Sequence, residues 1–126
     1  MQNREKKKVL AVVEDLLFTV KIMDAAKRVG LDAQFVKSEK DLLDKAHDKP
    51  LLIILDLNTT LVQPLKLITK LKGDGDLKNI SLIGFLSHVQ GELKMKAQEA
   101  GANMVMARSA FSQNLQQILK RHAGVM

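Results

Sequence analysis

Five short apolar runs alternate with five segments of helical periodicity along this chain of 126 residues. In the helical segments, apolar residues recur at intervals of three and four, which is the period of a single buried helix face. Strict alternation of strands and helices predicts right-handed crossovers, and therefore an α/β fold whose parallel sheet is covered by helices on both faces. The apolar runs are residues 8–13, 33–36, 51–56, 80–86 and 103–107.

Residues that favour helix ends bound the helical segments. Gly30 and Gly101 are expected to end the first and fourth helices, because glycine tolerates the left-handed conformation found there. Ser38 begins a capping-box pattern that opens the second helix. Pro64 suits the first turn of the third helix, and Ser109 is predicted to cap the last one.

Composition limits the classes of function open to the chain. Cysteine is absent, which excludes disulfides and thiolate chemistry. The net charge of +6 is compatible with nucleic-acid binding. However, aromatic residues make up only 3% and all are Phe, so few side chains could stack on the bases of a single strand, and a solvated basic surface is favoured. No apolar run is long enough for a membrane span or a signal-peptide core. We expect a cytoplasmic protein with one domain over residues 1–126 and no output domain.

Asp56 ends the third apolar run, where an unpaired carboxylate would be costly to bury. Ligands of parallel α/β sheets bind beyond the carboxyl ends of the strands, and Glu14 and Asp15 reach that same edge after the first run. Three carboxylates there would repel one another without a cation, and hard oxygen ligands favour Mg²⁺. An aspartate beside such an ion can accept a phosphoryl group. The alternative is that Glu14 and Asp15 only favour the first helix through its dipole.

In their order and spacing, these motifs resemble the receiver domain of two-component response regulators. The segments that carry the resemblance are "VLAVVED", "LLIILDLN" and "AGANMVMARSAF". The resemblance covers residues 8–122, and it implies a flavodoxin-like, three-layer, doubly wound fold of five βα units with strand order 2-1-3-4-5. It also implies that Asp56 is the phosphoacceptor, and that the backbone carbonyl of Asn58 joins Glu14, Asp15 and Asp56 around Mg²⁺.

The resemblance further implies a role in signal transduction. Such a protein is a phosphoprotein rather than an enzyme, and it receives its phosphoryl group from a histidine kinase or a phosphotransfer protein. Because no output domain is expected, its effect would come from contacts with an effector protein. Membrane binding is not expected.

Half of the implied site departs from the pattern of the family. Where the family has a hydroxyl at the end of the fourth strand, ungapped counting places Leu86, and Ser87 one residue later faces the opposite way. The family's lysine on the fifth strand is Arg108, and its aromatic switch residue is Val105. Arg108 and, given a local shift in register, Ser87 are therefore the candidate phosphoryl contacts, while His88 is expected to be a solvated loop residue.

Two alternatives to phosphoacceptance stay open. The first is a pseudo-receiver that binds partner proteins without phosphorylation. The second, carried by the basic charge alone, is a nucleic-acid-binding module.

Overall fold

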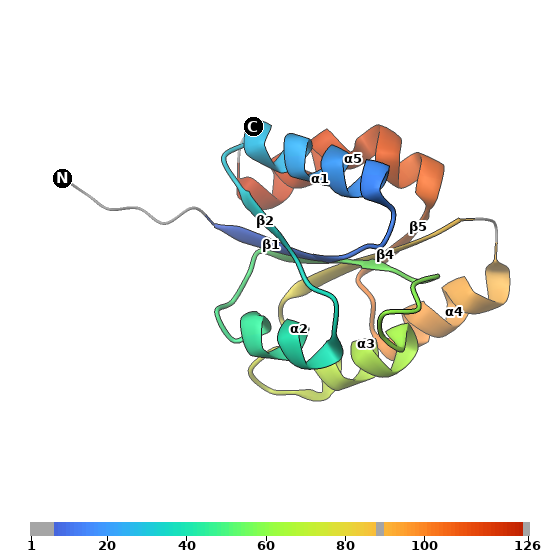
Figure 1. Cartoon of the computed structure of the whole chain (residues 1–126). Coiled ribbons are helices and arrows are strands. Elements are labelled where there is room, and N and C mark those ends of the chain that lie inside the picture. The colour runs from blue at the N-terminus through green and yellow to red at the C-terminus, as the bar shows by residue number, and fades with distance from the viewer. Residues whose placement is uncertain (1–6, 88–89, 125–126) are drawn as a thin grey trace.

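Five parallel strands and five helices alternate along residues 7–87 and 90–124, the part of the chain that this computed structural model describes (Figure 1). The strands are β1 (Lys8–Val12), β2 (Asp32–Phe35), β3 (Leu52–Asp56), β4 (Ser81–Leu86) and β5 (Met104–Ala107). The helices are α1 (Leu16–Arg28), α2 (Glu39–Ala46), α3 (Pro64–Gly73), α4 (Gly91–Ala100) and α5 (Arg108–Ala123).

The sheet forms the middle of three layers, with strand order β2-β1-β3-β4-β5. Helices α1 and α5 cover one face, and α2, α3 and α4 cover the other (Figure 1). Each face carries its own apolar core. All five positions of the central strand β3 are buried, which explains why its sequence is apolar without alternation. The predicted α/β fold with strand order 2-1-3-4-5 is therefore confirmed.

The observed helix ends agree with most of the predicted cap residues. The Ser38 side chain accepts a hydrogen bond from a backbone N–H in the first turn of α2, and Pro64 is the first residue of α3. The prediction that Ser109 caps the last helix is wrong. Helix α5 begins at Arg108, directly after β5, and its N-cap Ala107 makes no side-chain cap bond. Because no loop separates the two elements, Ser109 lies inside the first turn.

Within the described ranges, 7–87 and 90–124, no helix combines the length and the apolar character needed to cross a membrane. The extent of the single domain and the cytoplasmic location stay predictions.

Candidate functional site

Asp15 lies between β1 and α1, and its two carboxylate oxygens contact different groups. Oδ1 accepts hydrogen bonds from the backbone N–H groups of Leu17 and Phe18, at 2.9 and 3.2 Å. These bonds cap α1, because the first N–H groups of a helix have no partner within the helix. Oδ2 lies 3.3 Å from Nη1 of Arg108. Asp15 is therefore both a helix cap and half of an ion pair.

Asp56 ends β3, and only 6% of its surface is exposed. Its Oδ1 accepts a hydrogen bond of 2.9 Å from the backbone N–H of Asn58, and its Oδ2 lies 3.8 Å from Nη2 of Arg108. Burial raises the pKa of Asp56, while the Asn58 hydrogen bond and the Arg108 charge act against this rise. The charges of the two neighbouring acids raise the pKa further. The charged carboxylate is therefore stabilised first by the Asn58 hydrogen bond and then by the charge of Arg108.

Glu14 is directed toward the loop between β3 and α3. Its Oε1 accepts hydrogen bonds from Oγ1 of Thr59 at 2.7 Å, from the backbone N–H of Thr60 at 2.6 Å and from Oγ1 of Thr60 at 3.1 Å. The Thr59 bond is the main cause that lowers the pKa of Glu14, and the Thr60 bonds add to it. Glu14 thus joins the end of β1 to this loop, a contact that the sequence did not suggest.

Arg108, the first residue of α5, rests on aromatic rings. Its guanidinium carbon lies 5.0 Å from the ring centroid of Phe18 and 5.6 Å from that of Phe85. Phe85 is itself stacked on Phe111, with their centroids 5.1 Å apart. We call Phe18, Phe85 and Phe111 the aromatic floor. The rings of Phe18 and Phe85 attract the cation through their electron-rich faces, and they hold the guanidinium between Asp15 and Asp56.

Sequence reasoning missed the aromatic floor, although its spacing was a usable signal. Phe18 follows Asp15 by three residues and Phe111 follows Arg108 by three, so that in each case the ring lies close to the charged group along the chain. Phe85 is the partner of Asp56 in the register between β3 and β4. Each ring is therefore linked by position to one charged group of the site.

The end of β4 brings no hydroxyl to Asp56. Leu86 is buried in the core on the side of α2, α3 and α4. Ser87 is exposed, and its N–H and Oγ lie 2.8 and 3.2 Å from Oδ1 of Asn58. In the described part of the chain, no hydrogen bond joins Ser87 to Asp56 or Arg108. His88 lies outside the described residues.

The residues expected to hold Mg²⁺ are not arranged as a set of ligands. In residues 7–87 and 90–124, no three His, Cys, Asp or Glu side chains are placed to hold a metal ion together. Asp15 and Asp56 each direct one oxygen toward Arg108, and Glu14 is bonded to the two threonines. The guanidinium supplies the positive charge that a metal would bring. The described residues therefore do not present a ready-made set of ligands for Mg²⁺, and the metal site stays a prediction.

Replacing Asp56 by asparagine is expected to preserve or raise the free energy of unfolding at neutral pH. The substitution removes a buried charge, and Arg108 keeps its closer partner Asp15. Because the folded state raises the pKa of Asp56 above its ordinary 3.8, the stability of the parent should decline as the pH rises through the folded pKa. The asparagine variant should lack this decline. Denaturant unfolding at acidic and neutral pH measures both effects.

The matched control for this prediction is Asp15→Ala, which removes the cap of α1 and the shorter ion pair. We expect it to lower the free energy of unfolding by about 1 kcal/mol. If Asp56→Asn lowered stability at neutral pH as much as the control does, the ion pair of Asp56 would outweigh its burial cost, and our account of Asp56 would be incorrect.

Comparison with known proteins identifies the fold. No protein-family model and no curated protein sequence matches the chain. Among solved structures, the phosphorylated cyanobacterial phytochrome response regulator RcpA has a TM-score of 0.74 and 21% identity, over 93% of this chain and 91% of that one. The chemotaxis response regulator CheY4 of Vibrio cholerae has a TM-score of 0.78 and 18% identity, over 94% and 99%.

A third structure is the receiver domain of a sensor histidine kinase from Pseudomonas aeruginosa, which has a magnesium ion coordinated in its active site cleft. It has a TM-score of 0.78 and 17% identity, over 95% of this chain and 99% of that one. At such low identity the likeness concerns the fold, and it extends over nearly the whole length of each solved chain. This chain has the fold of a response-regulator receiver domain.

Proposed function

We propose that this chain is a pseudo-receiver, a non-enzymatic signalling domain that acts through contacts with partner proteins without phosphorylation of Asp56. One observation carries the proposal: the guanidinium of Arg108 lies within ion-pair distance of both Asp15 and Asp56 while it rests on the aromatic floor. The positive charge that a receiver would take from a metal is thus supplied by the chain itself.

The surroundings of Asp56 also support a site that does not turn over phosphate. Phosphoryl transfer needs positive charge and hydrogen-bond donors placed where the phosphoryl oxygens arrive. Asp56 is almost fully buried, Arg108 is already paired, and Leu86 brings no hydroxyl. Val105 is buried where the family has its aromatic switch residue. With Leu86 and Val105 at these two positions, the site lacks the side chains that would take up a second conformation, so a phosphoryl group would have no alternative state to stabilise.

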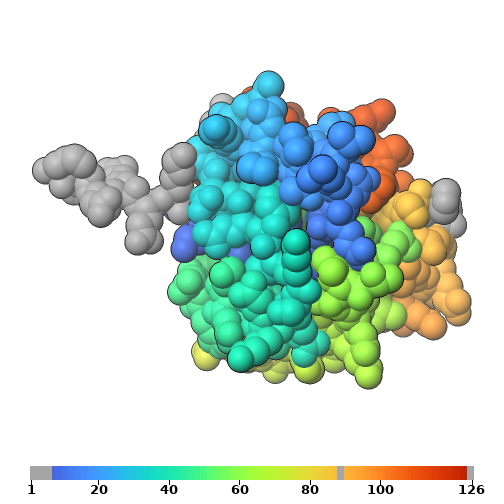
Figure 2. All heavy atoms as spheres, in the orientation of Figure 1, coloured from blue at the N-terminus to red at the C-terminus, as the bar shows by residue number. Residues whose placement is uncertain are grey.

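The outer surface of α1 supports a role in protein contacts. Four large apolar side chains there are between 47% and 82% exposed; they are Leu16, Leu17, Val20 and Met23. We call them the α1 patch, and α1 forms part of the surface turned toward the viewer in Figure 2. Adjoining exposed apolar residues are typical of interaction sites. We therefore propose that the α1 patch binds a partner protein. A histidine kinase or a phosphotransfer protein remains the partner predicted from the sequence.

Phosphoacceptance at Asp56 is the second candidate function. It is favoured by the position of Asp56 at the carboxyl end of β3, beside a cationic side chain, in a fold shared with a phosphorylated response regulator. Arg108 would have to release Asp56 for the reaction, so phosphorylation would be slow.

Intact-mass measurement after incubation with Mg²⁺ and acetyl phosphate separates the two functions. We expect the parent chain to keep its unmodified mass. The Arg108→Lys variant, which replaces the planar guanidinium by a compact ammonium, tests whether the arginine is what prevents the reaction. Addition of one phosphoryl group to the parent, and not to Asp56→Asn, would overturn the pseudo-receiver proposal in favour of phosphoacceptance.

A further inference from the structure

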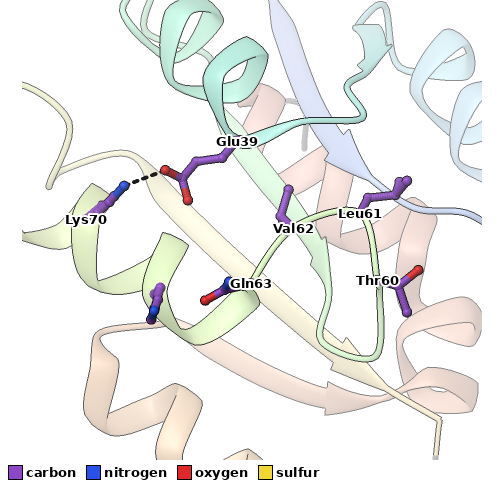
Figure 3. A pocket seen from close by; sticks show the side chains of 7 residues that line it. Glu39, Thr60, Leu61, Val62, Gln63 and Lys70 are labelled. Carbon is purple, nitrogen blue, oxygen red and sulfur yellow. Dashed lines mark hydrogen bonds and ion pairs between the residues drawn. The ribbon is translucent and has the colours of Figure 1, made fainter.

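Residues 60–66, which comprise the end of the loop before α3 and the first three residues of α3, separate two adjoining pockets. The first, which we call the basic pocket, has a volume of about 550 Å³ and lies between α2 and α3 (Figure 3). The second, which we call the apolar pocket, has a volume of about 330 Å³ and lies between the start of α3 and α4. Its apolar lining is formed by Leu57, Val62, Pro64, Leu65 and Leu93. The two pockets share Val62, Gln63 and Lys66.

The charge beside both pockets is positive. Helix α3 carries three lysines and no acidic residue. Lys70 projects into the basic pocket and pairs with Glu39 of α2 across it (Figure 3). Lys66 lies one turn earlier on the same helix and lines both pockets, and it forms no ion pair with any residue in the described part of the chain. An acidic ligand that reached this boundary would find a free ammonium group.

We propose that the two pockets form one docking site for an acidic segment of a partner protein. A bulky apolar side chain of that segment enters the apolar pocket, and a neighbouring carboxylate pairs with Lys66. This inference rests on the proposed function, because it names the chemistry of a protein partner. It is independent of the α1 patch, which lies on the other face of the sheet.

Size and charge both favour this occupant. The volume of the apolar pocket is near the lower limit of about 300 Å³ for ligand pockets, which suits one side chain better than a larger molecule. Apolar burial would supply the affinity, while the lysines would set the orientation of the segment and select against basic partners. The net charge of +6 would also attract an acidic partner before contact.

The test is a titration of the full, ¹⁵N-labelled chain with acetylated acidic hexapeptides, each with one central Leu, Ile, Met or Phe, followed by NMR. We expect the backbone amides of residues 57–63, Leu65, Lys66 and Leu93 to shift first. Lys66→Glu should weaken the binding about tenfold, because it replaces the attraction between Lys66 and the peptide carboxylate by repulsion. The control is Lys120→Glu. Lys120 is exposed on α5, which covers the opposite face of the sheet, so this variant changes the net charge by the same amount but should change the affinity much less.

The other outcomes would each overturn the inference. They are the absence of shifts at residues 57–66 with all four peptides, equal shifts with peptides in which lysine replaces every acid, and an equal loss of affinity in both charge variants. Inorganic phosphate that shifted the same amides with the same affinity would instead show a small-anion site. Peptide shifts confined to the α1 patch would overturn this docking site. They would leave the proposed function intact, because phosphorylation of Asp56 is tested separately by the mass measurement.

Discussion

Replacing Arg108 by alanine is expected to lower the free energy of unfolding by about 2 to 3 kcal/mol. The substitution leaves the buried carboxylate of Asp56 without a cation, and it removes the partner of Asp15. It also removes the packing of the guanidinium on Phe18 and Phe85. This loss is smaller than that for a fully buried ion pair, because a third of the Arg108 side chain is exposed to solvent. Urea unfolding followed by circular dichroism measures the loss.

A double-mutant cycle gives the control for this prediction. In the Asp56→Asn background, Arg108→Ala should cost less than in the parent, because no charged carboxylate is then left buried and unpaired. Arg108→Lys should lose an intermediate amount, since it keeps the charge but not the planar contact with the rings. Equal losses from Arg108→Ala in both backgrounds would show that Arg108 and Asp56 are not coupled. The short distance between Arg108 and Asp56 would then contribute nothing to stability, and it would no longer support the proposed function.

Replacing Phe85 by alanine is expected to cause the largest loss of stability, about 3 to 5 kcal/mol. Phe85 is fully buried on β4, its ring centroid lies 4.9 Å from that of Phe18, and it is stacked on Phe111. Alanine would leave a cavity between α1, α5 and the sheet that the rigid neighbours cannot fill. It would also remove one of the two rings below the guanidinium of Arg108. Thermal and urea unfolding measure the loss.

Two variants distinguish the aromatic contact from simple burial. Phe85→Leu keeps most of the apolar volume but removes the ring face, and we expect it to cost about 1 to 1.5 kcal/mol. Phe35→Ala removes the fourth phenylalanine, which is partly exposed on the edge strand β2 and lies outside the aromatic floor, so it should cost less than Phe85→Ala. A loss from Phe85→Ala no larger than that from Phe35→Ala would contradict the structural role given to the floor.

The fold could be predicted because its determinants are local and repeated. The continuous apolar run of β3 required burial on both faces, and a strand buried in this way belongs inside a covered parallel sheet. Pro64 marked the start of a helix, because its fixed backbone angle suits a first turn. The alternation of strands and helices then left few topologies, and the resemblance to receiver domains supplied the strand order. Only the cap at Ser109 was misplaced, since its position depends on how closely α5 follows β5.

The sequence by itself determined that Asp15, Asp56 and Arg108 would lie at the same edge of the sheet, because each of them is at or just after the carboxyl end of a parallel strand. Only the tertiary structure decided what those side chains contact. Glu14 is bonded to Thr59 and Thr60 across 45 and 46 residues of sequence, and Arg108 lies on rings contributed by two other elements. The physical reason is that the position of a residue along a strand fixes where its backbone lies in the sheet. The direction of a long polar side chain depends instead on hydrogen bonds, charge and burial, and these involve segments that only the folded chain brings together.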